Sequence, residues 1–167
     1  HLDMVDDIYG NSADVGGVLS HHSPHVMVRR MSDLYSIRDN RARLGGGIFG
    51  SNGILILEHF NEIRYNSATV QGGFARTTDM NFVIHYGLKI TNNVAGSNGG
   101  FIWTQRSDVN ITDVDEITNN VAQNQGGLIY IQNQSTSPTA FGVLVQNVTL
   151  LSNNRAEVLF TSVGGAI

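Results

Sequence analysis

The sequence predicts an all-β protein, a right-handed parallel β-helix of about six coils, each about 27 residues long with three short strands. Three features predict this fold: an Asn that recurs at a nearly constant spacing, a Gly-Gly pair after each such Asn, and apolar residues at fixed distances before it. The chain has 167 residues, which is within reach of one domain. We therefore interpret residues 1–167 as one β-helix segment and expect it to belong to a longer chain.

The recurring Asn belongs to the pattern apolar-x-x-Asn-x-Ala, which occurs six times. Its members are Asn11, Asn40, Asn66, Asn93, Asn120 and Asn154. Successive members lie 29, 26, 27, 27 and 34 positions apart. Asn tolerates a left-handed backbone, and its side chain can hydrogen-bond to local backbone and to the equivalent Asn of the next coil. We expect a structural Asn ladder at a buried or half-buried turn, followed by a corner at each Gly-Gly pair.

Apolar residues occupy three further columns, which lie nine, six and three positions before each Asn. The column at nine holds Leu2, Met31, Leu57, Ile84, Ile111 and Val145, and the column at six holds Val5, Leu34, Phe60, Gly87, Val114 and Val148. The column at three holds only Ile and Leu. Strands this short cannot bury a face alone, but parallel stacking at about 4.8 Å places each column upon itself. These columns are the predicted core.

Composition excludes several classes of protein. Charged residues make up 14% of the chain and the net charge is −4, so a nucleic-acid partner is not expected, because such binding needs a basic face. The chain has no Cys, which excludes disulfides and thiolate metal sites. It also lacks any run of eighteen apolar residues, so no transmembrane helix is expected.

The repeat resembles one known family. Gly164-Gly165-Ala166-Ile167 has the Gly-Gly-Ala-Ile motif of the chlamydial polymorphic outer-membrane proteins, and residues 99–102 and 126–129 are near variants. The second half-motif of that family, aromatic-or-aliphatic-x-x-Asn, matches Ile90/Asn93, Ile117/Asn120 and Leu151/Asn154. The resemblance covers nearly the whole chain and implies a right-handed β-helix on a cell surface, often in adhesion. This sequence departs from the family in having Ile or Leu where the family prefers Phe, and in lacking Cys.

The densest acidic cluster is Asp113, Asp115 and Glu116. Such a cluster could bind calcium or supply an acid–base pair, as in β-helical polysaccharide lyases and hydrolases. Those enzymes place acids on several adjacent coils. Here the position of Asp113 is occupied in other coils by His59, Tyr86 and Asn147. The position of Asp115 is occupied by Asn61, Leu88 and Thr149. We therefore expect solvated surface and no catalytic residue.

Three imidazoles, His21, His22 and His25, fall within six residues and could bind zinc or copper. Pro24 and the longer repeat favour an ordinary exposed loop instead, so no metal and no cofactor are expected. Another cluster near the start is read as plain surface charge; its members are Asp3, Asp6, Asp7 and Asp14.

The longest Asn spacing comes from a polar insertion at residues 132–140, which predicts an external loop. A tolerated insertion and a binding loop both fit it. Three N-glycosylation sequons begin at Asn110, Asn133 and Asn147. The two at Asn110 and Asn147 neighbour inward-facing residues and should face solvent.

These features favour a non-enzymatic extracellular or cell-surface module, structural or adhesive, within a rod or filament. The chain begins and ends inside repeats without a visible polar cap, so its expected partners are further coils of the same chain or head-to-tail copies of itself. Surface glycans and host receptors are further expected partners. The alternative is a carbohydrate-active β-helix, resembling a polysaccharide lyase or hydrolase, or a carbohydrate-binding one.

Overall fold

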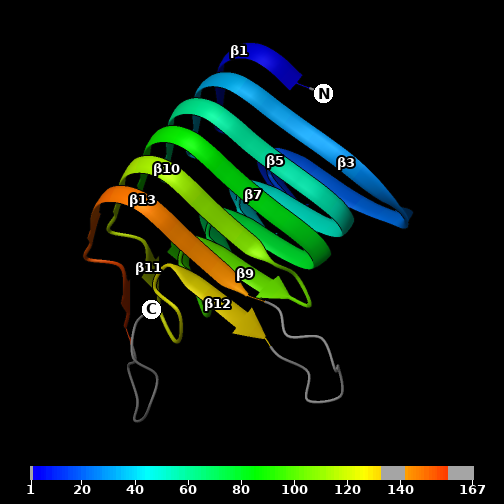
Figure 1. Ribbon diagram of the computed structural model, residues 1–167. Helices are drawn as coiled ribbons and strands as arrows, with labels where there is room; N and C mark the ends of the chain where they lie inside the picture. The colour runs from blue at the N-terminus through cyan, green and yellow to red at the C-terminus, as the bar shows by residue number, and fades with distance from the viewer. Residues whose placement is uncertain (1, 133–141, 158–167) are drawn as a thin grey trace.

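The protein is a parallel β-solenoid without helices in the part of the chain that the structure covers. The computed structural model describes residues 2–132 and 142–157, with the side chains of residues 2–6 and 23–27 left aside. Its strands stack as successive coils from the N-terminal β1 to the C-terminal β13 (Figure 1). The predicted all-β parallel solenoid is therefore confirmed.

Two sheets of parallel strands form the walls. The first has the order β1-β3-β5-β7-β10-β13, with β9 pairing β7 and β12 pairing β9. Its strands are β1 (Leu2–Tyr9), β3 (Leu19–Arg38), β5 (Ile48–Arg64), β7 (Ala75–Thr91), β9 (Ile102–Gln105), β10 (Val109–Thr118), β12 (Ile129–Gln132) and β13 (Val143–Ser152). The second sheet has the order β14-β11-β8-β6-β4-β2. Its strands are β2 (Ser12–Val15), β4 (Arg41–Leu44), β6 (Ser67–Gln71), β8 (Val94–Ala95), β11 (Val121–Ala122) and β14 (Arg155–Ala156).

The strands of the middle coils are longer than the sequence predicted. β3 has 20 residues, and β5 and β7 have 17 each. β7 is this long because it continues without a break through the segments that pair with β9 and with β10. β5 and β7 bend at a residue with positive φ fourteen positions before the ladder Asn, Asn52 in β5 and Asp79 in β7. Another bend is made by a single residue with positive φ seven positions before the ladder Asn, in the five repeats from Asn40 to Asn154. The residues at this corner are Asp33, His59, Tyr86, Asp113 and Asn147. Three separate strands per coil is therefore wrong for the middle coils, because these corners bend the chain without ending the pairing. The two C-terminal coils have three strands each, β9-β10-β11 and β12-β13-β14.

The number of turns is also smaller than predicted. The solenoid makes about four turns, against the six coils expected. Each wall does contain one strand for each of the six Asn repeats. The repeats at the two ends, however, contribute only parts of a turn to the described residues, which stop at Glu157.

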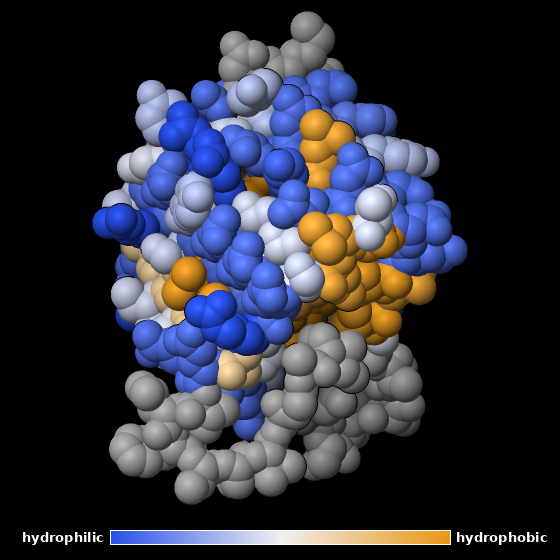
Figure 2. Space-filling model, turned by 90° about the vertical axis from the view of Figure 1, so that its left-hand side faces the viewer, coloured by the Kyte–Doolittle hydropathy of each residue, from blue (hydrophilic) through white to orange (hydrophobic). Residues whose placement is uncertain are grey.

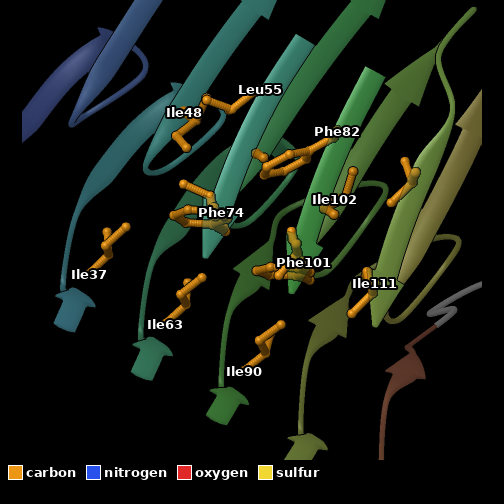
Figure 3. Packing of buried hydrophobic residues seen from close by; sticks show 14 of the residues in the cluster. Ile37, Ile48, Leu55, Ile63, Phe74, Phe82, Ile90, Phe101, Ile102 and Ile111 are labelled. Atoms are coloured by element: carbon orange, nitrogen blue, oxygen red, sulfur yellow. The ribbon is translucent and has the colours of Figure 1, made fainter. Parts of the chain in front are cut away.

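The apolar columns fill the interior (Figure 3). Leu57, Ile84 and Ile111, all nine positions before an Asn, are fully buried. The strand register stacks each on the next, pairing Leu57 with Ile84 and Ile84 with Ile111. Gly87 interrupts the column at six, and the Phe60 ring occupies its place: a Cβ at Gly87 would lie 2.1 Å from Cζ of Phe60.

The Gly-Gly pairs make a further corner, at which each glycine has its own role. Gly99 has a φ of +71°, which side chains disfavour. Gly100 has no room for a side chain, because a Cβ there would lie 2.0 Å from the carbonyl oxygen of Gly127 in the next coil. The corner therefore needs glycine at both positions.

Candidate functional site

The six ladder Asn residues form one continuous chain of amides across the coils. The side-chain nitrogen Nδ2 of each donates to the side-chain oxygen Oδ1 of the next. These distances are 2.8, 3.0, 3.0, 2.9 and 2.8 Å from Asn11 to Asn154. The backbone N–H of each also donates to the same oxygen, as from Asn93 to Asn120 at 3.1 Å.

The second Nδ2 hydrogen bond runs back to the preceding coil. Asn93 donates to the carbonyl of Ile63 at 3.1 Å, and Asn120 donates to that of Ile90 at 3.1 Å. The four inner Asn side chains are completely buried, and every polar atom of their amides has a partner. The left-handed residue is not the ladder Asn but the one before it, such as Asn92 or Asn119. The ladder therefore stabilises the solenoid, because a buried polar network is stabilising when all of its groups are paired.

The acidic cluster does not converge on one point. Asp113 is half-buried at the corner of β10 and accepts a hydrogen bond from Nδ2 of Asn147 at 2.9 Å. Asp115 is exposed. Glu116 lies 3.5 Å from the Lys89 ammonium and accepts a hydrogen bond from Thr118. No acid–base pair forms from these carboxylates.

The histidine cluster separates in space. His21 is buried with its Nδ1 3.4 Å from Arg29, and burial, followed by the charges of Arg29 and His22, lowers its pKa. His22 is exposed and its Nδ1 lies 2.6 Å from the Ser51 hydroxyl. His25 has no described side chain. These residues belong to β3 and not to the loop that was predicted, and the described residues contain no group of three metal-binding side chains.

The N-terminal aspartates that the structure describes form ordinary surface pairs. Asp14 accepts hydrogen bonds from the Arg43 guanidinium at 2.8 and 3.2 Å, which lower the pKa of its carboxyl group. Asp7 accepts from the Ser36 hydroxyl and lies 3.6 Å from Arg38. The side chains of Asp3 and Asp6 lie outside the described residues.

The sequons have three different settings. Asn110 is half-buried on β10, and Asn147 is exposed on β13 with its amide bonded to Asp113. Asn133 lies outside the described residues, as does the insertion at 132–140 apart from Gln132, the last residue of β12.

A cluster on the outer face of β3, β5 and β7 was missed by the sequence analysis. The Glu58 carboxylate, only 9% exposed, lies 3.1 Å from Nε of Arg30 and 2.9 Å from Nε2 of His85. His85 also contacts the Tyr86 ring, on which His59 stacks at 5.2 Å. Aligning the column eight positions before each Asn would have found the Glu58–His85 pair, because both occupy it. The cluster can hold an imidazole in place beside a buried carboxylate.

An open groove of about 380 Å³ lies next to this cluster on the same face. Its lining is Ile54, Asn81, Val83, Asp108, Asn110, Gly142, Val143 and Leu144. Asp108 donates its backbone N–H to Asn81 and accepts one from Gly142. Among the residues that the structure describes, no cation lines the groove.

Comparison with known proteins found no matching family model, no matching curated protein and no matching solved structure. The chlamydial repeat motif therefore gains no support, whereas the parallel β-solenoid is shown. Over the residues that are described, there is no helix long and apolar enough to cross a membrane.

Proposed function

We propose that this chain is a non-enzymatic structural module, a segment of a β-solenoid rod that continues by adding another coil along β13. The expected occupant is a coil of the same repeat, paired in parallel, because every strand pair in both sheets is parallel. In the isolated chain, that coil comes from a second copy.

One observation carries this proposal: the inward columns are open at β13. Leu151 is 53% exposed, whereas Ile117 and Ile90, in the same column of the preceding coils, are fully buried. Hydrophobic surface gathers toward the C-terminal coils in Figure 2. An exposed cross-section of a core beside an unpaired strand edge favours association.

The Asn ladder supports the same occupant. Upstream, each ladder residue donates its backbone N–H and one Nδ2 hydrogen to the Oδ1 of the next coil, as Asn120 does to Asn154. The corresponding donors of Asn154 have no acceptor among the described residues. A following coil with Asn at this position would supply one.

The test substitutes Leu151 by Lys, which places a charge in the open inward column. We expect the unmodified chain to self-associate with rising concentration in sedimentation velocity, and Leu151→Lys to reduce this strongly. Leu150→Lys is the matched control, because Leu150 is 48% exposed but lies in the outward column of Lys89 and Glu116. A strictly monomeric unmodified chain with β13 protected from hydrogen exchange would refute the proposal, as would an equal effect of both substitutions.

We further propose an extracellular or cell-surface location, with surface glycans or host receptors as partners. The support for this setting is the resemblance of the repeat sequence to the repeats of a cell-surface family. Antibody labelling of intact source cells tests it: labelling without permeabilisation is expected, and labelling only after permeabilisation would contradict it.

A carbohydrate-binding role is the second candidate, and the groove at Asn81, Asp108 and Asn110 favours it. Amide and carboxylate groups beside aliphatic side chains suit the hydroxyls and C–H faces of a neutral sugar. Binding of neutral oligosaccharides that is lost in Asp108→Ala would support this candidate over the purely structural one.

A further inference from the structure

The side of the solenoid formed by β9, β12 and the first residues of β5 and β7 carries a stack of aromatic rings around one arginine. Phe49, Arg76, Trp103 and Tyr130 occupy the same position in consecutive coils, as their strand pairing shows. The Arg76 guanidinium carbon lies 4.3 Å from the Trp103 ring centroid and 5.2 Å from that of Phe49. The guanidinium is thus held between two rings, a geometry that fixes its plane.

Arg76 has no anionic partner within the described part of the chain. Its one hydrogen bond joins Nε to Oε1 of Gln71 at 3.1 Å, which leaves both Nη atoms available. Burial lowers its pKa, and the positive charge of Arg43 lowers it further. Arg43 is itself paired with Asp14 at 2.8 Å. A partly buried cation without a counter-charge is unfavourable, and proteins normally pair such groups.

Trp103 supplies a second unsatisfied donor in the same stack. Its side chain is 1% exposed, and its indole Nε1 is buried without a hydrogen-bond partner. Buried polar groups are rarely left unpaired, so an orphan of this kind points to a bound species. The N–H belongs to the ring on which the Arg76 guanidinium lies, so the unpaired donors belong to one pair of stacked side chains.

We propose that Arg76 and Trp103 form a binding site for a small oxyanion group, a carboxylate, sulfate or phosphate. The two Nη atoms of Arg76 bind its oxygens through charge-assisted hydrogen bonds, and the indole N–H donates to a further oxygen. Arg43 adds positive potential nearby. This site is independent of rod assembly at β13 and of the groove at Asn81, Asp108 and Asn110.

The chain contains a single Trp, so all of its tryptophan fluorescence comes from Trp103 in the proposed site. Its fluorescence is titrated with sodium sulfate, phosphate, acetate and glucuronate at constant ionic strength, with glucose as the uncharged control. We expect a saturable change with at least one anion and none with glucose. Tighter binding of glucuronate than of acetate identifies an acidic sugar as the source of the group. Tighter binding of sulfate or phosphate identifies a free tetrahedral anion.

Arg76→Gln removes the charge and should weaken binding by at least about tenfold, the loss expected for a charge-assisted pair. Arg64→Gln removes the same charge from a residue that pairs with Glu62 on another side of the coil, and should stay within about twofold of the unmodified chain. If circular dichroism shows that Arg76→Gln does not fold, Arg76→Lys is used instead to test whether Arg76 binds the anion. Lys keeps the charge without the planar fork, and weaker but saturable binding is expected.

Three results would overturn the proposal. One is the absence of any saturable response, in fluorescence and in melting temperature, up to about 100 mM of each anion at fixed ionic strength. Another is binding that Arg76→Gln or Arg76→Lys leaves unchanged. The last is an equal loss of binding in Arg64→Gln, which would show only a general effect of net charge.

Discussion

Replacing Asn120 by Leu removes one amide from the middle of the buried ladder. Its Oδ1 accepts the backbone N–H of Asn93 at 3.1 Å and Nδ2 of Asn93 at 2.9 Å, while its own Nδ2 donates to the carbonyl of Ile90. Leu leaves these three groups without that partner in a fully buried site. The backbone itself is not strained by the change, because the left-handed residue of this corner is Asn119.

The magnitude follows from these three groups. A buried polar group that loses its partner costs about 1–3 kcal/mol. Local relaxation and entry of water reduce the simple sum, so we expect a loss of about 3–5 kcal/mol in the free energy of unfolding. Such a loss is a large fraction of the about 5–15 kcal/mol that stabilises a typical domain.

Urea unfolding followed by circular dichroism measures this loss. Asn61→Leu is the control, because Asn61 is exposed on β5 and the same substitution there should change stability by no more than about 0.5 kcal/mol. Equal effects of the two substitutions would refute the reasoning, since the cost would then come from Leu itself and not from the broken ladder.

The remaining predictions concern packing and catalysis. Gly87→Ala should destabilise by about 1–3 kcal/mol in the same assay, because the added Cβ would overlap the Phe60 ring. Gly142→Ala, which has no atom within 4 Å of the added Cβ, should be close to neutral, and an equal loss there would contradict this account. The purified protein should release no product from pectic or other acidic polysaccharides, because Asp113 and Asp115 do not meet other acids. Product formation abolished by Asp113→Ala or Asp115→Ala would show that this prediction is wrong.

The parts of the fold that repeat were predictable from the sequence. Leu34, Phe60 and Val114 are buried where a fixed distance from the Asn predicts it, because stacking places the same environment at the same position of each coil. In a solenoid, residues that lie one repeat apart in the sequence are neighbours in adjacent coils.

The corner at His59 and Tyr86 could not be predicted in the same way. Both have φ above +50°, a backbone conformation that bulky side chains disfavour, and no glycine marks the bend. The strands consequently looked shorter in the sequence than they are.

The two clusters that the sequence analysis missed depend on pairs across coils. Glu58 and His85 lie 27 positions apart, as do Arg76 and Trp103, so neither pair forms a local motif. Only the strand register makes them neighbours. Whether such neighbours pair, stack or remain unsatisfied depends on side-chain conformation, which spacing does not specify.

The constancy of the Asn ladder determines where this protein can change in length. Between each residue nine positions before a ladder Asn and the Ala two positions after it, the spacing is the same in all six repeats. All the variation, from 26 to 34 residues, lies between that Ala and the next inward column. One residue added inside the constant stretch would move every following side chain to the opposite face of the strand. Loss or duplication of a whole repeat would leave both the amide chain and the core columns continuous, so the coil is the unit in which such a chain can lengthen or shorten.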